Sequence, residues 1–119
     1  MKAQQSVEAL DRTFHALSDA SRRSMIDRLS HGPASVKELA QPLAMALPSV
    51  MKHLSVLQSG GLVVSEKIGR VRTYRMTPQA LTGIESWVAA HKARLNRSFD
   101  RLEDYLLEAT HKRKRGSRK

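Results

Sequence analysis

The sequence predicts a mainly α-helical domain with one small β-hairpin. Three observations support this fold class: four helix-compatible segments before residue 60, a β-branched segment centred on Gly69, and a long helix-compatible segment after it. The 119 residues fit a single domain and leave little room for a catalytic cleft. We therefore expect helices, a hairpin and a final helix, in that order.

The first two helices are predicted from apolar spacing and capping signals. Residues 6–17 carry one apolar stripe at helical spacing, formed by Val7, Leu10, Phe14 and Leu17. A second helix follows Asp19, its predicted N-cap, and ends at Gly32-Pro33. Its apolar residues are Met25, Ile26 and Leu29.

A very short third helix and a longer fourth helix come next. Ser35 and Glu38 have the spacing of a capping box, and Pro42 ends the third helix after about two turns. Pro48 suits a first helical position, so the fourth helix spans roughly residues 48–59, before Gly60-Gly61. The fourth helix turns three apolar residues to the core: Val50, Leu54 and Leu57.

The C-terminal half begins with a predicted hairpin over residues 62–76, in which Gly69 supplies the positive φ of the turn. Thr77-Pro78 is a cap-plus-proline start, and the last helix then extends to about Ala109. The nine residues after 110 carry six Lys or Arg and no acid, without apolar periodicity. We expect residues 1–110 to form one domain and residues 111–119 a disordered basic tail.

Composition restricts the function classes. The net charge of +10 favours a polyanionic partner, either nucleic acid or an anionic membrane surface. The absence of cysteine excludes disulfides, iron–sulfur clusters, thiolate zinc sites and cysteine nucleophiles. No apolar run approaches the roughly 20 residues of a membrane span, and the N-terminus lacks a signal-peptide core. We expect a soluble, cytoplasmic protein with no membrane partner, no enzyme activity and no cofactor.

The third and fourth helices form the pattern that points to a function. A short helix, a tight turn and a helix with a polar outer face make a helix-turn-helix, whose second helix fits the roughly 12 Å wide major groove. Lys52 can donate to guanine or to a phosphate, whereas Met51 offers only apolar contact, for example to a thymine methyl. The alternative is that the two helices are simply half of a small core. The predicted DNA-facing residues are Ser49, Met51, Lys52 and Ser55.

The hairpin that follows strengthens this interpretation. Lys67, Arg70 and Arg72 cluster at its tip, with Glu66 as the one acid nearby. A β-hairpin directly after a recognition helix is the wing of a winged helix, which contacts the DNA backbone or minor groove. A solvated charged turn is the alternative.

These segments resemble the ArsR-type winged-helix repressors, and more narrowly the metal-independent branch of that family. The resemblance covers about residues 10–107 and is most specific from Leu47 to Val63. It implies a homodimer, paired through its N- and C-terminal helices, whose recognition helices enter successive major grooves of a palindromic operator on double-stranded DNA. It rests on ALSDASRRSMIDRL, on PASVKELAQPLAMALPSVMKHLSVLQSGGLV and on EKIGRVRTYRM.

Several positions add detail to the resemblance. The family usually has Pro at position 20 and often Ser at positions 46 and 51, where this chain has Ala20, Ala46 and Met51. Met51 should alter base preference, and Ala46 should weaken the N-cap of the fourth helix by up to about 1 kcal/mol. His53 matches the family's Lys-His-Leu or Arg-His-Leu, and is either a packed, hydrogen-bonded histidine or a phosphate donor.

An apolar stripe on the last helix predicts the dimer. Leu81, Val88, Leu95 and Leu102 recur every seven residues, flanked by further apolar and aromatic residues. Pairing with the first helix and with both helices of a second chain would bury this stripe, whereas the alternative is an entirely intramolecular core. The predicted dimerisation residues are Val7, Leu10, Phe14, Leu81, Ile84, Val88, Leu95, Phe99 and Leu102.

No metal site is expected. Thiolate sites on the third helix cannot form without cysteine, and His15, His31 and His91 are scattered along the chain. The best remaining set, at helical spacing near the end of the last helix, is interpreted as a surface charge cluster and consists of Asp104, Glu108 and His111.

The predicted function is that of a sequence-specific, double-stranded-DNA-binding repressor, dimeric, which blocks polymerase and is released by an unidentified effector. The alternative is a non-specific architectural DNA-binding protein, to which the basic tail lends weight. The two functions differ in how strongly an operator is preferred over random duplex.

Overall fold

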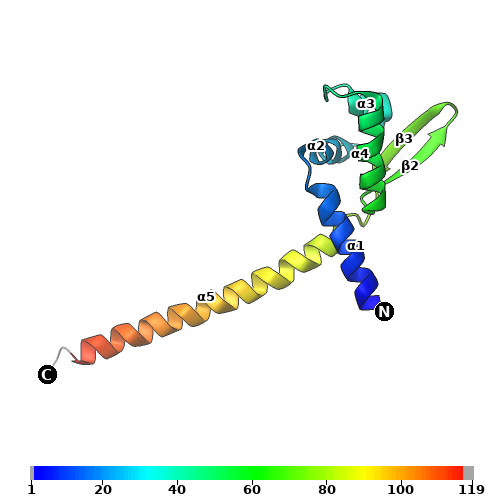
Figure 1. Ribbon diagram of the computed structural model, residues 1–119. Helices are drawn as coiled ribbons and strands as arrows, with labels where there is room; N and C mark the ends of the chain where they lie inside the picture. Colours follow the sequence, from blue (N-terminus) through cyan, green and yellow to red (C-terminus); the bar gives the residue numbers. More distant parts are fainter. Residues whose placement is uncertain (1, 117–119) are drawn as a thin grey trace. The chain divides into compact units, whose positions relative to one another are not determined.

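The computed structural model describes the backbone of residues 2–116 and the side-chain surroundings of residues 7–113. Two compact units are distinguished, Met1–Ile84 and Glu85–Lys119. Figure 1 shows the first unit as a cluster of short helices with a projecting hairpin. The elements in chain order are α1 (Lys2–Leu17), α2 (Ala20–Leu29), β1 (Ala34–Ser35), α3 (Val36–Ala40), α4 (Leu47–Ser59), β2 (Val63–Ile68), β3 (Val71–Met76) and α5 (Thr82–Gly116).

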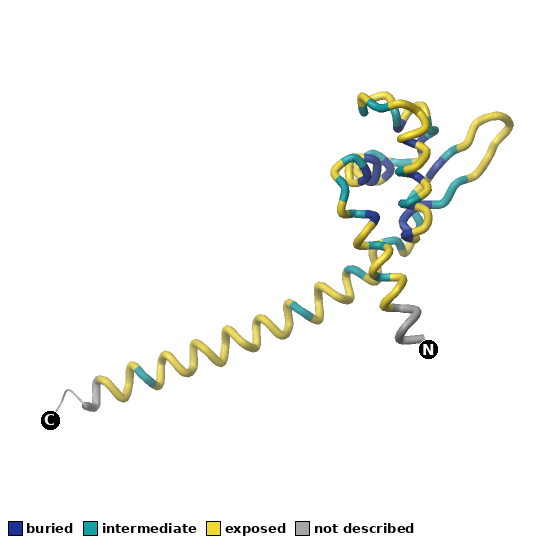
Figure 2. The backbone as a smooth tube through the Cα atoms, in the orientation of Figure 1, coloured by how far each residue is buried: buried dark blue, intermediate teal, exposed yellow. Residues whose placement is uncertain are grey.

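The core of the first unit is built around α4, which contacts α1, α2, α3 and β2. Figure 2 shows that the buried backbone segments lie in this unit, on α2, α4 and the base of the hairpin. The predicted core residues of α4 are all fully buried, and the fold class expected from the sequence is confirmed. The buried hydrophobic side chains are Ala16, Met25, Ile26, Leu29, Ala34, Leu39, Val50, Leu54, Leu57, Leu62, Val63 and Tyr74.

The expected two-stranded hairpin is present as β2 and β3, and a third strand that the sequence did not predict extends it to a sheet with the order β1-β3-β2. Tyr74 on the central strand is paired with Ala34 on one side and with Ser65 on the other, in antiparallel register. β1 has two residues, which is too short for an alternating apolar pattern to reveal it. It exists because β3 offers a free edge, to which the chain between α2 and α3 pairs.

Most capping predictions are confirmed. The Asp19 carboxylate accepts a hydrogen bond from the Arg22 backbone N–H (3.0 Å), so Asp19 caps α2 as expected. Ser35 and Glu38 form the reciprocal capping box of α3. However, α3 has five residues rather than about two turns, because the chain already leaves the helix before Pro42.

The start of the last helix was predicted incorrectly. The Thr77 N–H donates to the Leu62 carbonyl (2.9 Å), so the pairing of β3 with β2 continues for one more residue before the chain turns, and α5 begins at Thr82. Leu81, the first residue of the predicted heptad series, therefore precedes the helix. At the other end α5 continues through Gly116, beyond the expected end near Ala109, and residues 117–119 of the expected tail lie outside the described part.

Gly60, at the C-terminal end of α4, lies close to the backbone of α1. The Thr13 hydroxyl of α1 donates to the Gly60 carbonyl (2.8 Å). A Cβ atom at Gly60 would lie 2.9 Å from Cβ of the fully buried Ala16 and 3.0 Å from the Arg12 carbonyl oxygen. The two helices can therefore pack this closely only because the residue at position 60 is a glycine, which has no side chain.

We predict that Gly60→Ala lowers the free energy of unfolding by about 1–3 kcal/mol, because the backbone of α1 must move away from α4. Denaturant unfolding at a fixed protein concentration measures the change. The control is Gly83→Ala, whose new Cβ would make an ordinary 3.5 Å contact with Leu10 and should leave stability unchanged or slightly higher. Equal stability of Gly60→Ala and the wild type would contradict the tight approach.

Candidate nucleic-acid interface

The helix α3 precedes the turn that leads into α4, and hydrogen bonds at its N-terminal end fix its position. In its capping box the Ser35 N–H donates to Glu38 Oε1 (3.1 Å) and the Glu38 N–H donates to Ser35 Oγ (3.2 Å). The Ser35 backbone N–H, followed by its hydroxyl, lowers the pKa of the Glu38 carboxyl, and Arg28 adds to this effect from 3.4 Å. The charged form of Glu38 therefore ties α3 to the end of α2.

The predicted DNA-facing residues of α4 share one exposed face. Ser49, Met51, Lys52 and Ser55 are all exposed, opposite the fully buried Val50, Leu54 and Leu57. Four elements pack against the buried stripe, so the rotation of α4 about its own axis is fixed. The structure thus places the four residues together on the free surface of a helix whose N-terminal end is also exposed.

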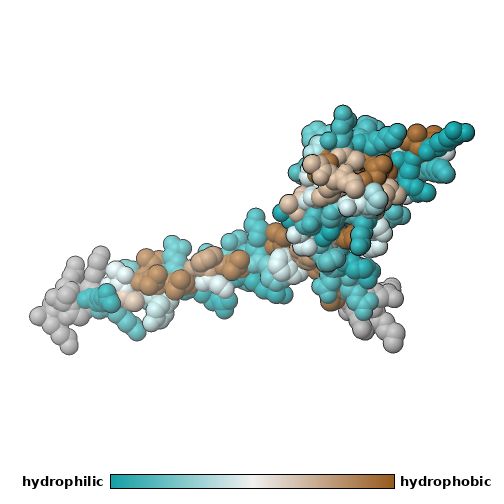
Figure 3. All heavy atoms as spheres, turned by 45° about the horizontal axis from the view of Figure 1, so that its top comes forward, coloured by the Kyte–Doolittle hydropathy of each residue, from teal (hydrophilic) through white to brown (hydrophobic). Residues whose placement is uncertain are grey.

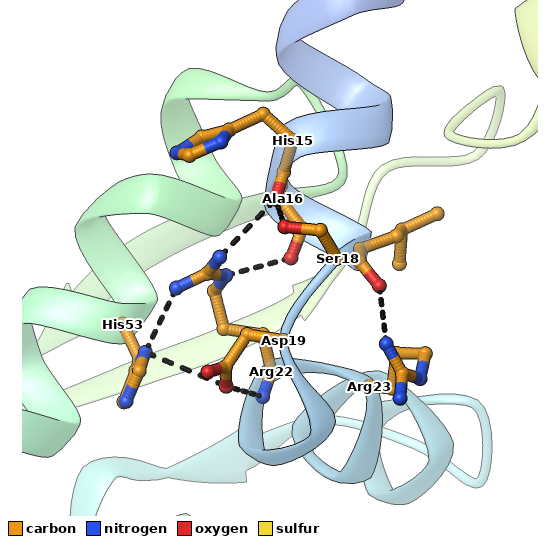
Figure 4. Close-up of polar contacts among 8 residues, drawn as sticks. His15, Ala16, Ser18, Asp19, Arg22, Arg23 and His53 are labelled. Atoms are coloured by element: carbon orange, nitrogen blue, oxygen red, sulfur yellow. Dashed lines mark hydrogen bonds and ion pairs between the residues drawn. The ribbon is translucent and has the colours of Figure 1, made fainter.

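His53 lies on the flank of α4 and is partly buried. Its Nδ1 atom is 3.1 Å from a guanidinium nitrogen of Arg22 on α2 and 4.0 Å from a carboxylate oxygen of Asp19 (Figure 4). The packed, hydrogen-bonded histidine is therefore present in the structure. The second possibility, a contact from its other ring nitrogen to a phosphate, stays a prediction.

The wing consists of β2 and β3 joined at Gly69, which has the predicted positive φ of 63°. Lys67 and Arg72 are directly opposite each other in the register, and Arg70 lies in the turn. All three cations are exposed, and the Arg72 guanidinium donates to the Ser65 hydroxyl (3.0 Å). Two like charges at one register position favour an anion beside the wing.

A groove of about 520 Å³ joins the helix-turn-helix to the wing. It brings Met51, Arg70 and Arg72, which the sequence assigned to DNA contact, to one surface. It also contains Lys37, Leu47 and Val71, which the sequence analysis missed. Its lining combines apolar side chains with three cationic residues, Lys37, Arg70 and Arg72. The lining residues are Ser35, Val36, Lys37, Leu47, Met51, Arg70, Val71 and Arg72.

The missed residues had only weak sequence signals. Lys37 follows the N-cap of α3 by two positions and looks like an ordinary surface lysine. Leu47 and Val71 are apolar and would be assigned to the core, yet they are 49% and 52% exposed. Leu47 is the first residue of α4, where an exposed apolar side chain can contact a base. Its exposure could be recognised only from the structure.

The predicted dimerisation residues are distributed over both units. On α1, Val7 and Phe14 are exposed and Leu10 is partly buried. On α5, Val88, Leu95, Phe99 and Leu102 are exposed, and so are Tyr105, Leu106 and Leu107. Figure 3 shows this apolar surface as patches along α5 between hydrophilic residues. A stripe of this extent on a single exposed helix is unusual for a monomeric surface.

Within the described residues, no three His, Asp or Glu side chains are grouped as they would be to hold a metal ion. None of the helices in that part of the chain is long and apolar enough to span a membrane.

Comparison with known proteins identifies the family. Residues 17–66 match the family described as "Helix-turn-helix domain". The HTH-type transcriptional regulator Rv2034 of Mycobacterium tuberculosis is 40% identical over 76 residues, which cover 64% of this chain and 71% of that protein. The crystal structure of the ArsR family transcriptional regulator RHA00566 is 44% identical, with a TM-score of 0.71, and covers 75% of this chain and 92% of that chain.

A solution NMR structure from Mycobacterium bovis is also similar. It shows the homodimeric winged helix-turn-helix DNA-binding domain, residues 1–100, of Mb0332, described as a possible ArsR-family transcriptional regulator. The identity is 28% and the TM-score 0.62, over 77% of this chain and 86% of that chain. The chain belongs to the ArsR family. It is a helix-turn-helix transcriptional regulator.

One departure of this ArsR-family chain from the family's pattern has a visible effect. Ala46 occupies the N-cap position of α4 with extended backbone angles, but makes no side-chain hydrogen bond there. The Ser49 N–H instead donates to the Ala46 carbonyl (3.0 Å), and Pro48 has no N–H to offer. The recognition helix thus lacks the cap that α2 and α3 both have.

We predict that Ala46→Ser raises the free energy of unfolding by up to about 1 kcal/mol, because its hydroxyl can accept from the Ser49 N–H and leave the carbonyl of residue 46 to its helical partner, the Val50 N–H. Urea unfolding of the DNA-free protein gives the difference. Ser35→Ala serves as the counterpart, since it removes an existing cap and should lower stability by a similar amount. No gain in Ala46→Ser, together with a loss in Ser35→Ala, would show that α4 does not need a side-chain cap.

Proposed function

We propose that the chain acts as a homodimeric repressor that binds a palindromic operator and blocks polymerase. The observation that carries the proposal is the groove between α4 and the wing, where Met51 lies beside Arg70 and Arg72. Lys52 is exposed on the same helix, next to Met51. In this function α4 enters the major groove, the wing contacts the adjacent backbone, and two-fold symmetry repeats both contacts about one helical turn away. The DNA-binding residues are Ser49, Met51, Lys52, His53, Ser55, Lys67, Arg70 and Arg72.

The roles within this surface differ. Lys52, Ser49 and Ser55 donate to bases or phosphates, while Met51 provides apolar contact in the groove. Lys67, Arg70 and Arg72 contact phosphates and supply affinity without sequence information. Base preference therefore depends on α4, and salt dependence depends mainly on the wing.

Dimerisation is supported by the exposed apolar residues of α1 and α5 and by the similarity to the homodimeric domain of Mb0332. Burying Leu95, Phe99 and Leu102 against a second copy removes apolar surface from water, at about 25 cal/mol per Å². A dimer also converts two weak half-site contacts into one stronger one. Residues 1–110 supply DNA binding and dimerisation in this proposal, and residues 111–119 add a basic, sequence-independent attraction.

We propose that the chain belongs to the metal-independent branch of the family, so that no metal ion regulates it. The sequence has no cysteine, so a thiolate site cannot form, and the effector is left unassigned. Unchanged operator affinity with added Zn²⁺ or with a chelator would agree with this placement, whereas release by Zn²⁺ would contradict it. Because the ligand is genomic DNA, the proposed compartment is the cytoplasm.

Selection of bound sequences from a random duplex library tests the function directly. We expect a palindromic consensus that is bound at least about tenfold more tightly than random duplex at physiological salt. A smaller preference would favour a non-specific architectural protein and contradict the repressor.

We predict that Lys52→Ala weakens operator binding by about 1–3 kcal/mol and relaxes the preference at one base position, if Lys52 donates to guanine. Titration against the operator and its single-base variants measures both effects. Arg12→Ala on α1 is the charge-matched control, because Arg12 is exposed and lies beside the C-terminal end of α4, away from the N-terminal turns that carry Lys52. An equal loss on all sequences would make Lys52 a phosphate contact instead.

We predict that Leu102→Glu weakens self-association by about 100-fold or more, because each copy would bury an unpaired charge in the dimer. Operator binding should weaken with it. Ala93→Glu makes the same charge change at an exposed position about half a turn away from the apolar stripe, and should leave the dimer intact. Sedimentation equilibrium distinguishes the two variants, and a dimeric Leu102→Glu protein would contradict the proposed interface.

A further inference from the structure

A buried arginine lies beside the recognition helix. Arg22 of α2 is 9% exposed and is the one buried charged residue among the described side chains. Its Nε atom donates to the Ala16 carbonyl (2.7 Å), and Nη2 donates to the His15 carbonyl (3.1 Å). Both carbonyls lie at the C-terminal end of α1, where helix carbonyls lack partners within the helix. Arg22 therefore joins the end of α1 to α2.

The third contact of Arg22 reaches α4. Its Nη1 atom lies 3.1 Å from Nδ1 of His53 (Figure 4). A guanidinium has only hydrogen-bond donors, so Nδ1 must be the acceptor and cannot carry a proton. The neutral ring then has its proton on Nε2. One side chain on α2 thus determines the tautomer of a histidine on the recognition helix.

The protonated nitrogen of this tautomer points away from the cluster. Figure 4 shows both dashed contacts of His53 meeting at Nδ1, with the other ring nitrogen directed away from Arg22. The His53 side chain is 21% exposed, and no buried side-chain nitrogen or oxygen among the described residues is without a partner. The Nε2–H group is consequently an accessible donor on the flank of α4, one position after Lys52.

Asp19 completes the cluster. Its carboxylate accepts the Arg22 backbone N–H (3.0 Å), and this hydrogen bond is the main cause that lowers the pKa of Asp19. The positive charge of Arg22 acts in the same direction, while partial burial opposes it. Asp19 stays ionised, so it fixes the first turn of α2, from which the Arg22 side chain extends.

We propose that Arg22 is a positioning residue that holds His53 as the Nε2–H tautomer, and that this neutral N–H donates to a DNA phosphate at the wall of the major groove. The proposal rests on the operator binding proposed above. A phosphate is the partner, rather than a base, because His53 is on the flank of α4 that contacts α2, whereas Met51 and Lys52 are on its outer face.

A neutral donor has a consequence that a lysine contact does not share. Each phosphate neutralised by a cation releases counterions, which adds about 0.9 to the slope of log K against log salt concentration. A neutral imidazole N–H contributes a hydrogen bond to a charged oxygen without this term. His53 should therefore affect affinity at every salt concentration to the same degree.

Two substitutions separate the two nitrogens of His53. The amide of His53→Asn lies near the Nδ1 position, so it can accept from Arg22 but cannot reach the phosphate. The longer His53→Gln places its amide near Nε2, so it can donate outward but leaves Arg22 without its third acceptor. We expect His53→Asn to keep the melting temperature and lose about tenfold in affinity per half-site.

His53→Gln should show the reverse pattern, with affinity within about threefold of the wild type and a lower melting temperature. Both variants are measured at pH 8 over a range of salt concentrations, and both should keep the wild-type salt slope. A slope reduced by about 0.9 in either variant would mean that His53 acts as a cation and would overturn the proposal. Equal affinity of the two variants would also overturn it.

The tautomer and the phosphate can be observed independently. Long-range ¹H–¹⁵N NMR spectra at pH 8 should show His53 with an unprotonated Nδ1 in the wild type, and a mixture of tautomers in Arg22→Lys. A proton on Nδ1 of the wild type would contradict the role of Arg22. In a methylphosphonate scan of the operator, one substitution should weaken the wild type and His53→Gln but not His53→Asn. No such position would remove the phosphate from the proposal.

These experiments distinguish a failure of the Arg22–His53 proposal from a failure of the repressor proposal. If the wild type shows no operator preference, the repressor proposal fails whatever the NMR spectra show. If the wild type selects an operator but the Asn and Gln variants behave alike, operator binding stands and the role of the Arg22–His53 contact is overturned.

Discussion

The fixed rotation of α4 is the constraint on which the DNA-binding surface depends. Val50, Leu54 and Leu57 are fully buried, and four elements pack against the helix that carries them. Because protein interiors are closely packed, they do not tolerate a rotation of α4 that would expose these three side chains. Since the outer face follows from the buried one, the same three residues decide which side chains can enter a groove. This tertiary support explains how α4 can begin at Leu47 although Ala46, its N-cap residue, provides no side-chain cap.

Local signals were sufficient for most of the fold. The capping box of Ser35 and Glu38, the N-cap Asp19 and the positive φ of Gly69 each depend on a few neighbouring residues, and all were predicted correctly. The errors occurred where a distant partner decides the structure. β1 exists only through pairing with β3, and α5 starts late because the Thr77 N–H is engaged by Leu62. Short-range periodicity contains no information about either partner.

The same distinction applies to the candidate site. The outer face of α4 and the basic wing could be predicted, because helical periodicity and turn chemistry determine which side chains are exposed. The groove between them could not, since Lys37, Leu47 and Val71 come from three different elements. Arg22 was equally invisible, because in the sequence it is one of two adjacent arginines in α2. Its burial follows from the turn that places the last carbonyls of α1 within reach of its guanidinium.

The cationic wing and the outer face of α4 differ in the kind of contact that they can make with DNA. Lys67 and Arg72 are opposite each other in the wing, and such pairing of like charges destabilises the free hairpin. In the proposed complex, a DNA phosphate between them would remove this repulsion, so the unfavourable energy of the free hairpin would become part of the binding energy. That gain is screened as salt increases and is the same for every sequence. Discrimination among sequences must therefore come from α4, where Met51 and Leu47 offer apolar contacts that salt does not screen.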